Sequence, residues 1–399
     1  MSFGRTRLAD WPLDPGVTYL NHGTVGVAPR RVLAAQQTIR DEMERAPSQF
    51  LLREVSSLVG VPSGRPSRLR EAAGVVAAFA GAARDDLVFV DNTTTGVNAV
   101  LRSLPLQPGD EILITAHNYG AVARVAKFVA RERRAGVIAV PVPYPAYDRR
   151  ALVDLVAAAI TPRTRVAVLD HITSESALIF PIAELAAACR ARGVPVLVDG
   201  AHVPGVLPLD VPALGVDWYT ANLHKWACAP RSSAFLWTHP SRQADLHPPV
   251  ISWGLDAGYT AEFDWVGTRD PSPWLAAPEG IAYLRDLGVD AVWRHNHDLA
   301  WRAARALTDR WRTTLGIDET AVGFMATVPL PQSLGRTSDE AARLRDALLF
   351  DDRIEVQVHA AHDQLWTRVS VQVYNDWEDI ERLGDAVARK AEAAEAMRL

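Results

Sequence analysis

The sequence predicts an α/β fold, with a large domain built on a mostly parallel central sheet and a smaller α+β C-terminal domain. Short apolar runs alternate with amphipathic segments through the middle of the chain, as in β-α-β units that bury a sheet under helices on both faces. After about Pro278 the pattern changes to long helices and half-exposed strands. The 399 residues suffice for two domains, which we place at residues 1–278 and 279–399.

The expected elements follow from these patterns in chain order. Strands of the large domain are short apolar runs, expected at 86–90, 111–114, 137–140, 165–169, 194–198, 216–223 and 233–237. Amphipathic periodicity predicts helices between them at 97–104, 121–134, 151–160 and 182–192. In the C-terminal domain we expect one or two helices over 279–315, further helices at 338–349 and 376–397, and strands at 324–328, 354–358 and 366–373.

Composition argues against several classes of protein. The formal net charge is −5 and no basic arm is present, so we expect no nucleic-acid partner. The longest apolar runs are too short to span a bilayer, so we expect no membrane partner. The two cysteines, Cys189 and Cys228, have neither metal nor redox spacing, which favours a reducing cytoplasm. No histidine cluster has the pattern of a zinc site, and we predict no metal.

A lysine and an aspartate stand at positions typical of a cofactor site. Asp199 follows the buried strand at 194–198, and Lys225 follows the next predicted strand, which turns polar toward its end. The carboxyl ends of neighbouring strands are where open α/β sheets bind ligands. An aspartate that keeps the pyridine nitrogen protonated and a lysine that forms a Schiff base suit pyridoxal phosphate, PLP.

The segment 91–96 is a candidate phosphate cradle. Its threonines precede Val97, Val100, Leu101 and Leu104, an apolar stripe with helical spacing. Free N–H groups and hydroxyls at a helix N-terminus bind anions, although an ordinary N-cap explains the same residues. Asn222 and His224, just before the lysine, are placed to add donors to the same phosphate. His202 either contacts the cofactor's phenolate oxygen or starts the turn at 204–205.

Several strings in this chain match one known family. They lie at 19–26, 92–98, 116–120, 198–202, 222–226, 265–270 and 368–375 and run in family order over nearly the whole chain. The chain resembles the class V aminotransferase group of fold-type I PLP-dependent enzymes, and is most similar to isopenicillin N epimerase-like proteins. The resemblance implies a fold-type I PLP-dependent transferase-like fold and PLP as cofactor.

The resemblance also implies roles for single residues. Lys225 would carry the cofactor, Asp199 would pair with the pyridine nitrogen, and Tyr119 would be an acid-base group. The other cofactor contacts would come from His117 on the ring face, Ser174 and His202 at the phenolate oxygen, and Thr93, Thr94, Asn222 and His224 at the phosphate. Arg368 would bind the substrate α-carboxylate, with Asn21 and His22 in the same substrate site. Thr268 would reach the phosphate of the neighbouring subunit, which implies a homodimer with shared active sites.

Ordinary structural roles compete with three of these assignments. His117 is alternatively a buried hydrogen-bonded histidine, Tyr119 a packing residue, and Arg368 a partner in a surface salt bridge. The chain also departs from the family pattern. It has Glu175 within a stretch where related proteins often show Ser-Pro-Thr-Gly, and it has Arg231 after the lysine, facing either an acidic substrate group or solvent.

The leading functional hypothesis is an isopenicillin N epimerase-like enzyme that acts at Cα of an amino-acid substrate. Lys225 is the expected base, and Tyr119 or His22 would supply the proton on the opposite face. The alternatives are a PLP-dependent β-eliminating C–S lyase, an aminotransferase, and a binding protein on a retired enzyme scaffold. Sulfur transfer to a mobile protein cysteine is disfavoured, because residues 353–366 contain none.

Overall fold

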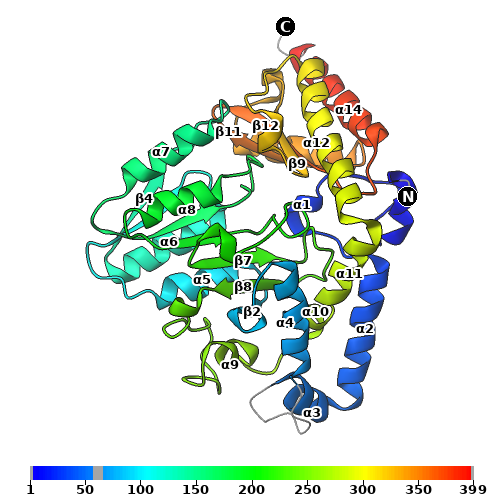
Figure 1. Cartoon of the computed structure of the whole chain (residues 1–399). Helices are drawn as coiled ribbons and strands as arrows, with labels where there is room; N and C mark the ends of the chain where they lie inside the picture. Colours follow the sequence, from blue (N-terminus) through cyan, green and yellow to red (C-terminus); the bar gives the residue numbers. More distant parts are fainter. Residues whose placement is uncertain (1–2, 57–65, 397–399) are drawn as a thin grey trace.

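The computed structural model describes residues 3–56 and 66–396, and its centre is a seven-stranded sheet (Figure 1). The strands are β2 (Leu87–Val90), β3 (Glu111–Thr115), β4 (Gly136–Val140), β5 (Thr164–Asp170), β6 (Val196–Asp199), β7 (Trp218–Asn222) and β8 (Ala234–Thr238). They are arranged in the order β2-β8-β7-β6-β5-β3-β4, and β8 runs antiparallel to both of its neighbours. The prediction of a mostly parallel sheet is confirmed, and the expected strand ends differ from these by at most two residues.

The sheet is buried because successive side chains enter two different cores. Val166 and Val168 of β5 pack into a core shared with α5 (Thr93–Ser103) and α6 (Gly120–Arg133). Ala167 and Leu169 of the same strand pack into the opposite core, which holds residues of α7 (Arg149–Ala159) and α8 (Ile182–Arg190). A strand with both faces covered needs apolar residues at every position, which explains the continuous runs in the sequence.

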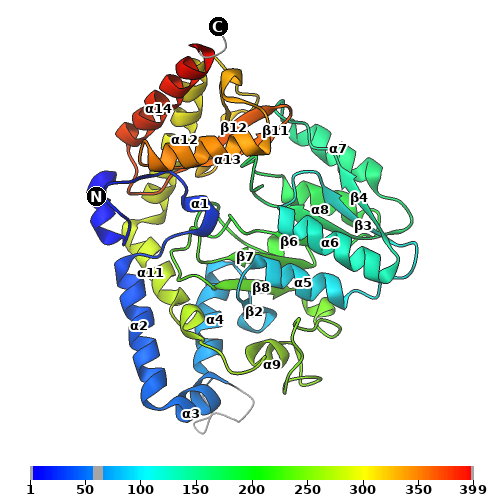
Figure 2. The ribbon, with the colours of Figure 1, turned by 180° about the vertical axis from the view of Figure 1, so that it is seen from behind.

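The C-terminal part is a three-stranded antiparallel sheet in the order β11-β12-β9, beside long helices (Figure 2). Its elements are β9 (Met325–Pro329), β11 (Gln357–Ala361), β12 (Gln364–Ser370), α11 (Ala277–Leu287), α12 (Val289–Trp311), α13 (Ser338–Phe350) and α14 (Trp377–Ala396). Gly288, with a φ of 83°, separates α11 from α12 within the helical region expected at 279–315. The predicted end of the last helix at Met397 lies outside the described residues.

The N-terminal segment crosses to the C-terminal part of the molecule. Strand β1 (Thr18–Tyr19) pairs in parallel with β10 (Ile354–Glu355), so the expected strand at 354–358 is divided between two sheets. The short helix α1 (His22–Val25) follows, and then the long helix α2 (Arg30–Arg45), which lies at one edge of the molecule in Figure 1. No helix or strand of this N-terminal segment was predicted from the sequence. The domain boundary at 278/279 stays a prediction.

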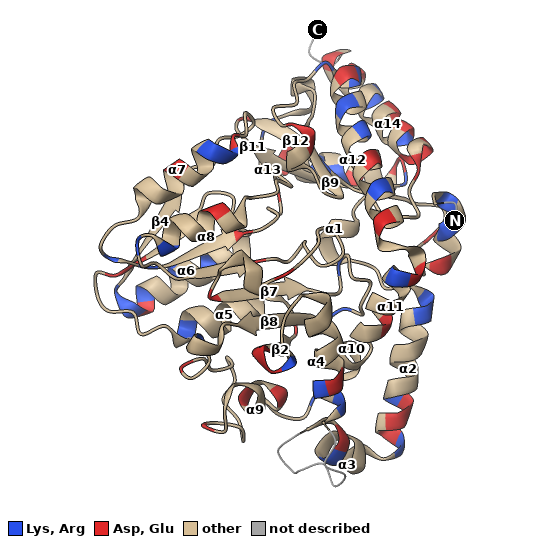
Figure 3. Ribbon diagram, in the orientation of Figure 1, with Lys and Arg blue, Asp and Glu red and all other residues tan. Residues whose placement is uncertain are grey.

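Charged side chains of both signs are interspersed along the outer helices, including α2, α12 and α14 (Figure 3). This mixed surface agrees with the small net charge of −5. Across residues 3–56 and 66–396, the helices are all too short or too polar to cross a membrane.

Candidate active site

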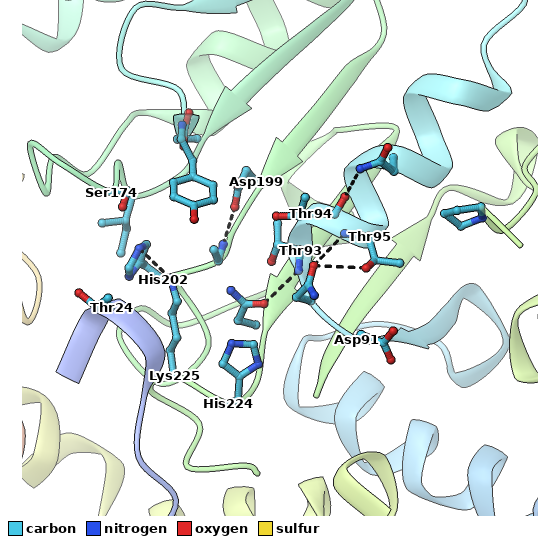
Figure 4. A pocket seen from close by; sticks show the side chains of 18 of the residues that line it. Thr24, Asp91, Thr93, Thr94, Thr95, Ser174, Asp199, His202, His224 and Lys225 are labelled. Atoms are coloured by element: carbon cyan, nitrogen blue, oxygen red, sulfur yellow. Dashed lines mark hydrogen bonds between the residues drawn. The ribbon is translucent and has the colours of Figure 1, made fainter. Parts of the chain in front are cut away.

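A cavity of about 690 Å³ opens at the carboxyl ends of the central strands. Its walls include residues from the ends of β5, β6 and β7 and from the start of α5 (Figure 4). The residues predicted from sequence that line it are Thr93, Thr94, Tyr119, Ser174, Asp199, His202, Asn222, His224 and Lys225. The fold therefore brings most of the predicted site together at the edge of the sheet where parallel strands bind ligands.

Lys225 is half-buried, and its side chain lines the cavity. Its Nζ is 3.1 Å from Nε2 of His202, the contact drawn as a dashed line in Figure 4. Burial, followed by the positive charge of Arg368, lowers the pKa of Lys225 to about 7, against an opposing effect of Asp199. Burial and the nearby Lys225 also hold the pKa of His202 well below its usual value. An amine in this setting is available as a nucleophile or base at neutral pH.

Two carboxyl groups lie side by side at the base of the cavity. Asp199 ends β6 and Asp170 ends β5, and the two residues are direct partners in the parallel ladder. Burial raises the pKa of Asp199 to about 6, and burial together with Asp199 raises the pKa of Asp170 well above its usual value. Asp170 accepts a 3.3 Å bond from the backbone N–H of Tyr119. Its Oδ2 is buried without a hydrogen-bond partner among the described residues.

Asp170 is a site residue that the sequence analysis missed. It lines the cavity and stands at the end of a predicted strand, as Asp199 does. The rule that drew attention to Asp199, a carboxylate at the carboxyl end of a buried strand, applies equally to Asp170. The signal was therefore present in the sequence.

The start of α5 has the features of an anion site. Asn92 caps the helix by accepting from the N–H of Thr95 at 2.9 Å. Asn222 Oδ1 accepts from the N–H of Thr93 at 3.0 Å, which fixes this helix end against β7. The Thr93 hydroxyl is buried and lacks a partner within the described part of the chain. A phosphate here would receive that hydroxyl and the N–H of Thr94, since the N–H groups of Thr93 and Thr95 are bonded to Asn222 and Asn92.

The cavity fits the two ends of PLP. The unpartnered Thr93 hydroxyl stands at the proposed phosphate end, and the two carboxyl groups stand where a protonated pyridine nitrogen needs a negative partner. The chain contains three lysines, of which Lys127 and Lys390 lie on the outer helices α6 and α14. Lys225 is thus the lysine that the fold presents to this cavity.

Arg368 lies directly behind the cavity wall on β12 and is 1% exposed. It donates to the carbonyl of Ser174 at 2.6 Å and to the hydroxyl of Thr24 at 2.7 Å, and both of these residues line the cavity. Burial lowers its pKa to about 10, against an opposing effect of Glu175. A surface salt bridge, the competing explanation from sequence, does not describe this buried guanidinium. To clamp a carboxylate, Arg368 must exchange these internal contacts for the substrate.

His22 and Asn21 are placed differently from the expectation. Both ring nitrogens of His22 are engaged inside the protein, with Tyr374 Oη and with the Lys225 carbonyl, each at 2.9 Å. The ring is fully buried and faces this network rather than the cavity. Asn21 donates to Glu355 at 2.8 Å and is likewise engaged beside β10. The structure therefore does not bring these two residues to the substrate space.

His117, Tyr119 and Thr268 have three different settings. His117 Nδ1 is 2.7 Å from the hydroxyl of Ser176, and its ring meets Tyr144 edge-on with centroids 5.4 Å apart. His117 is not among the residues that line the cavity. Tyr119 lines the cavity and is 47% exposed. Thr268 is exposed on the loop after α9 (Tyr259–Asp264).

Other groups give no sign of metal or thiol chemistry at this site. Over residues 3–56 and 66–396, His, Cys, Asp and Glu side chains form no cluster able to hold a metal ion. Cys189 and Cys228 are both buried, and burial raises the pKa of each thiol. Arg231 is exposed and donates to the carbonyl of Gly26 at 3.2 Å.

Comparison with known proteins identifies the family. The sequence model described as "Aminotransferase class-V" matches residues 65–383, most of the chain. The chain belongs to the class V aminotransferase family. It is accordingly an enzyme whose cofactor is PLP, and the PLP-binding fold predicted from sequence is confirmed.

Similar proteins fall into two groups by their names. The chain is 34% identical to isopenicillin N epimerase of Streptomyces clavuligerus, an alignment that covers 95% of this chain and 98% of that protein. It is also 34% identical to the putative L-cysteine desulfhydrase 1 of Oryza sativa subsp. japonica, over 94% of this chain and 83% of the relative. A solved cystine C–S lyase complex superposes with a TM-score of 0.77 at 23% identity, covering 97% of this chain and 99% of that chain, and supports the fold.

Proposed function

We propose that this enzyme removes and returns the Cα proton of an amino-acid substrate, and that epimerisation is the reaction. The observation that carries the proposal is a half-buried amine, Lys225, which shares one cavity with Asp199 and Tyr119 and whose pKa is lowered to about 7. PLP, when bound, weakens the Cα–H bond of an amino acid by drawing electrons into its ring. The chain must then hold the reactants and move one proton.

Different groups of cavity residues are proposed to bind different parts of PLP. Asp199 would hold the protonated pyridine nitrogen, with Asp170 beside it. Thr93, Thr94, Asn222 and His224 would hold the phosphate, and Ser174 and His202 would contact the ring oxygen. These assignments are supported by the burial of the two carboxyl groups and by the unpartnered Thr93 hydroxyl in the described part of the chain.

Proton transfer is assigned to two residues. Lys225 would take the Cα proton, since its lowered pKa leaves much of the amine uncharged at neutral pH. Tyr119 would return a proton on the other face, because it is the exposed phenol at the cavity wall. His22 is the weaker candidate for this step, because both of its ring nitrogens are engaged elsewhere. Arg368 would bind the α-carboxylate in a bidentate manner after releasing Ser174 and Thr24.

The second candidate is β-elimination, which the similarity to L-cysteine desulfhydrases favours. It requires the same proton removal by Lys225 and differs in the fate of the side chain. A substrate with a leaving group on Cβ would lose it before a proton returns to Cα. An acceptor cysteine is unnecessary for this reaction, which agrees with the burial of Cys189 and Cys228.

One experiment separates the candidates. Purified enzyme is incubated in deuterated water with L-alanine, which has no β leaving group, and with L-cysteine, which has one. Epimerisation predicts the D-amino acid carrying deuterium at Cα, whereas elimination predicts pyruvate, ammonia and sulfide from L-cysteine alone. A keto acid from L-alanine would instead indicate transamination. Lys225→Ala is the control and should give none of these products.

We further propose that the working unit is a homodimer. Thr268, expected to act in the neighbouring subunit, is exposed in the single chain. The segment 250–255 beside the cavity exposes Val250, Ile251, Trp253 and Leu255, with Trp253 86% exposed. Large exposed apolar side chains in one segment are typical of an interface. Light scattering after gel filtration should give twice the chain mass, and a monomeric mass at full activity would refute the proposal.

A further inference from the structure

The turn that contains His22 is packed directly against the main chain of the cofactor lysine. Gly26 ends α1 with a φ of 64°, a backbone conformation that residues other than glycine rarely adopt. A Cβ placed on Gly26 would lie 1.8 Å from the His224 carbonyl oxygen and 2.9 Å from the Lys225 Cα. No side chain fits in that space, so only glycine at position 26 allows this turn to lie directly against the lysine loop.

His22 connects this turn to Lys225 by one defined hydrogen bond. Its Nε2 is 2.9 Å from the Lys225 carbonyl oxygen, which can only accept, so Nε2 must carry the proton. Its Nδ1 is then the acceptor, and the Tyr374 hydroxyl donates to it at 2.9 Å. The amide nitrogen of Gln372 also lies near Nε2, but at 3.4 Å it is too distant to displace the bond to the carbonyl.

The ring has little freedom to leave this position. Trp226 packs on it with centroids 4.8 Å apart, and Trp11 meets its edge at 5.8 Å. The three hydrogen-bonded groups come from the N-terminal segment, the lysine loop and the C-terminal part, because Tyr374 follows β12. Burial lowers the pKa of His22 to about 4, so the ring remains neutral and keeps one N–H donor at physiological pH.

We propose that His22 is a positioning residue that holds the Lys225 carbonyl through its Nε2–H, with Tyr374 fixing the ring for that bond. This inference rests on the proposed role of Lys225 as the cofactor lysine. A lysine side chain is flexible, so the position of its main chain determines the region that Nζ can reach. A displacement of about 1 Å in a reacting group costs on the order of 100-fold in rate.

The test measures how fast PLP becomes attached to cofactor-free enzyme. Stopped-flow absorbance follows the visible band, and borohydride reduction with peptide mass analysis confirms attachment at Lys225. His22→Ala is expected to slow attachment by about 10- to 100-fold. His22→Gln returns an N–H donor near the Nε2 position and should recover most of the rate, and Tyr374→Phe should lie between. The matched control is His297→Ala, since His297 is also buried and lies 3.2 Å from a backbone carbonyl, that of Val322, away from the cavity.

The outcomes separate positioning from a merely structural role. Wild-type attachment rates in His22→Ala would overturn the inference. So would an equal slowing in His297→Ala, which would indicate general destabilisation. If His22→Ala fails to fold, the test is the comparison of Tyr374→Phe with His22→Gln. PLP attachment in Tyr374→Phe that is as fast as in His22→Gln would then overturn the inference. Wild-type enzyme that attaches no PLP at Lys225 would refute the proposed function itself.

Discussion

The lowered pKa of Lys225 leads to a quantitative prediction for the cofactor-free enzyme. A pKa of about 7 leaves about half of the amine uncharged at pH 7, against roughly one in 3000 for a lysine of pKa about 10.5. After burial, the positive charge of Arg368 is the largest effect that lowers the pKa of Lys225. Arg368→Met should therefore raise the pH at which Lys225 becomes reactive, while Arg231→Met, which changes an exposed arginine of the following loop, should leave it unchanged.

Competitive reductive methylation measures this directly. Cofactor-free enzyme is treated with limiting formaldehyde and cyanoborohydride between pH 5 and 10, and the methylation of each lysine is followed by peptide mass. Lys127, exposed on α6, provides an internal reference in the same sample. Half-maximal reactivity of Lys225 near pH 7 is expected. A midpoint near 10 in the wild type, or an unchanged midpoint in Arg368→Met, would refute the reasoning.

The same shift has a consequence for stability. Between pH 7 and 10.5 the unfolded chain binds more protons at this lysine than the folded chain does. The contribution of Lys225 to the free energy of unfolding of the cofactor-free enzyme therefore rises with pH across that window. Lys225→Met should flatten the pH dependence of the urea midpoint there.

Three further predictions concern single side chains. Asp199→Asn should weaken PLP binding by about 100-fold or more because a pyridinium loses its charged partner, while Asp170→Asn, which keeps the acceptor for Tyr119, should stay within a few-fold in a fluorescence titration. Arg368→Lys should lower kcat/KM for an α-amino acid by on the order of 100-fold, since lysine cannot form the bidentate contact, and an unchanged value would remove the carboxylate assignment. Arg70 forms a buried ion pair with Asp264, in which Nη2 lies 2.7 Å from Oδ1. Arg70→Met should therefore cost about 3–5 kcal/mol in urea unfolding because it leaves Asp264 unpaired, and a loss below about 1 kcal/mol would contradict this.

The central sheet was predictable because its strands are buried on both faces. Continuous apolar runs mark such strands in sequence, and their carboxyl ends identified Asp199 and Lys225 before any contact was known. The N-terminal helices were missed for a physical reason. Helix α2 buries Val32, Gln36 and Met43 and is polar along most of its length, so few apolar residues mark it in the sequence.

The sequence could not predict which of the site histidines face the cavity. His22, His117 and His202 all stand in strings typical of the family, yet only His202 lines the cavity. Which of them does so depends on contacts with Tyr374, Ser176 and Lys225, residues from segments distant in the chain. Periodicity and spacing carry no information about such side-chain directions. Asp170, in contrast, directly follows the strand predicted at 165–169, so its position at a strand end could be inferred from the sequence.

The most direct test of the site is the identity of the residue that carries PLP. Enzyme purified with PLP is reduced with borohydride, digested, and each of the three lysine-containing regions is weighed by mass spectrometry. The site described here predicts the cofactor mass on Lys225 alone, with Lys127 and Lys390 unmodified, and loss of the adduct in Lys225→Ala. Stoichiometric attachment at either of the other two lysines, or an equally strong adduct in Lys225→Ala, would contradict it.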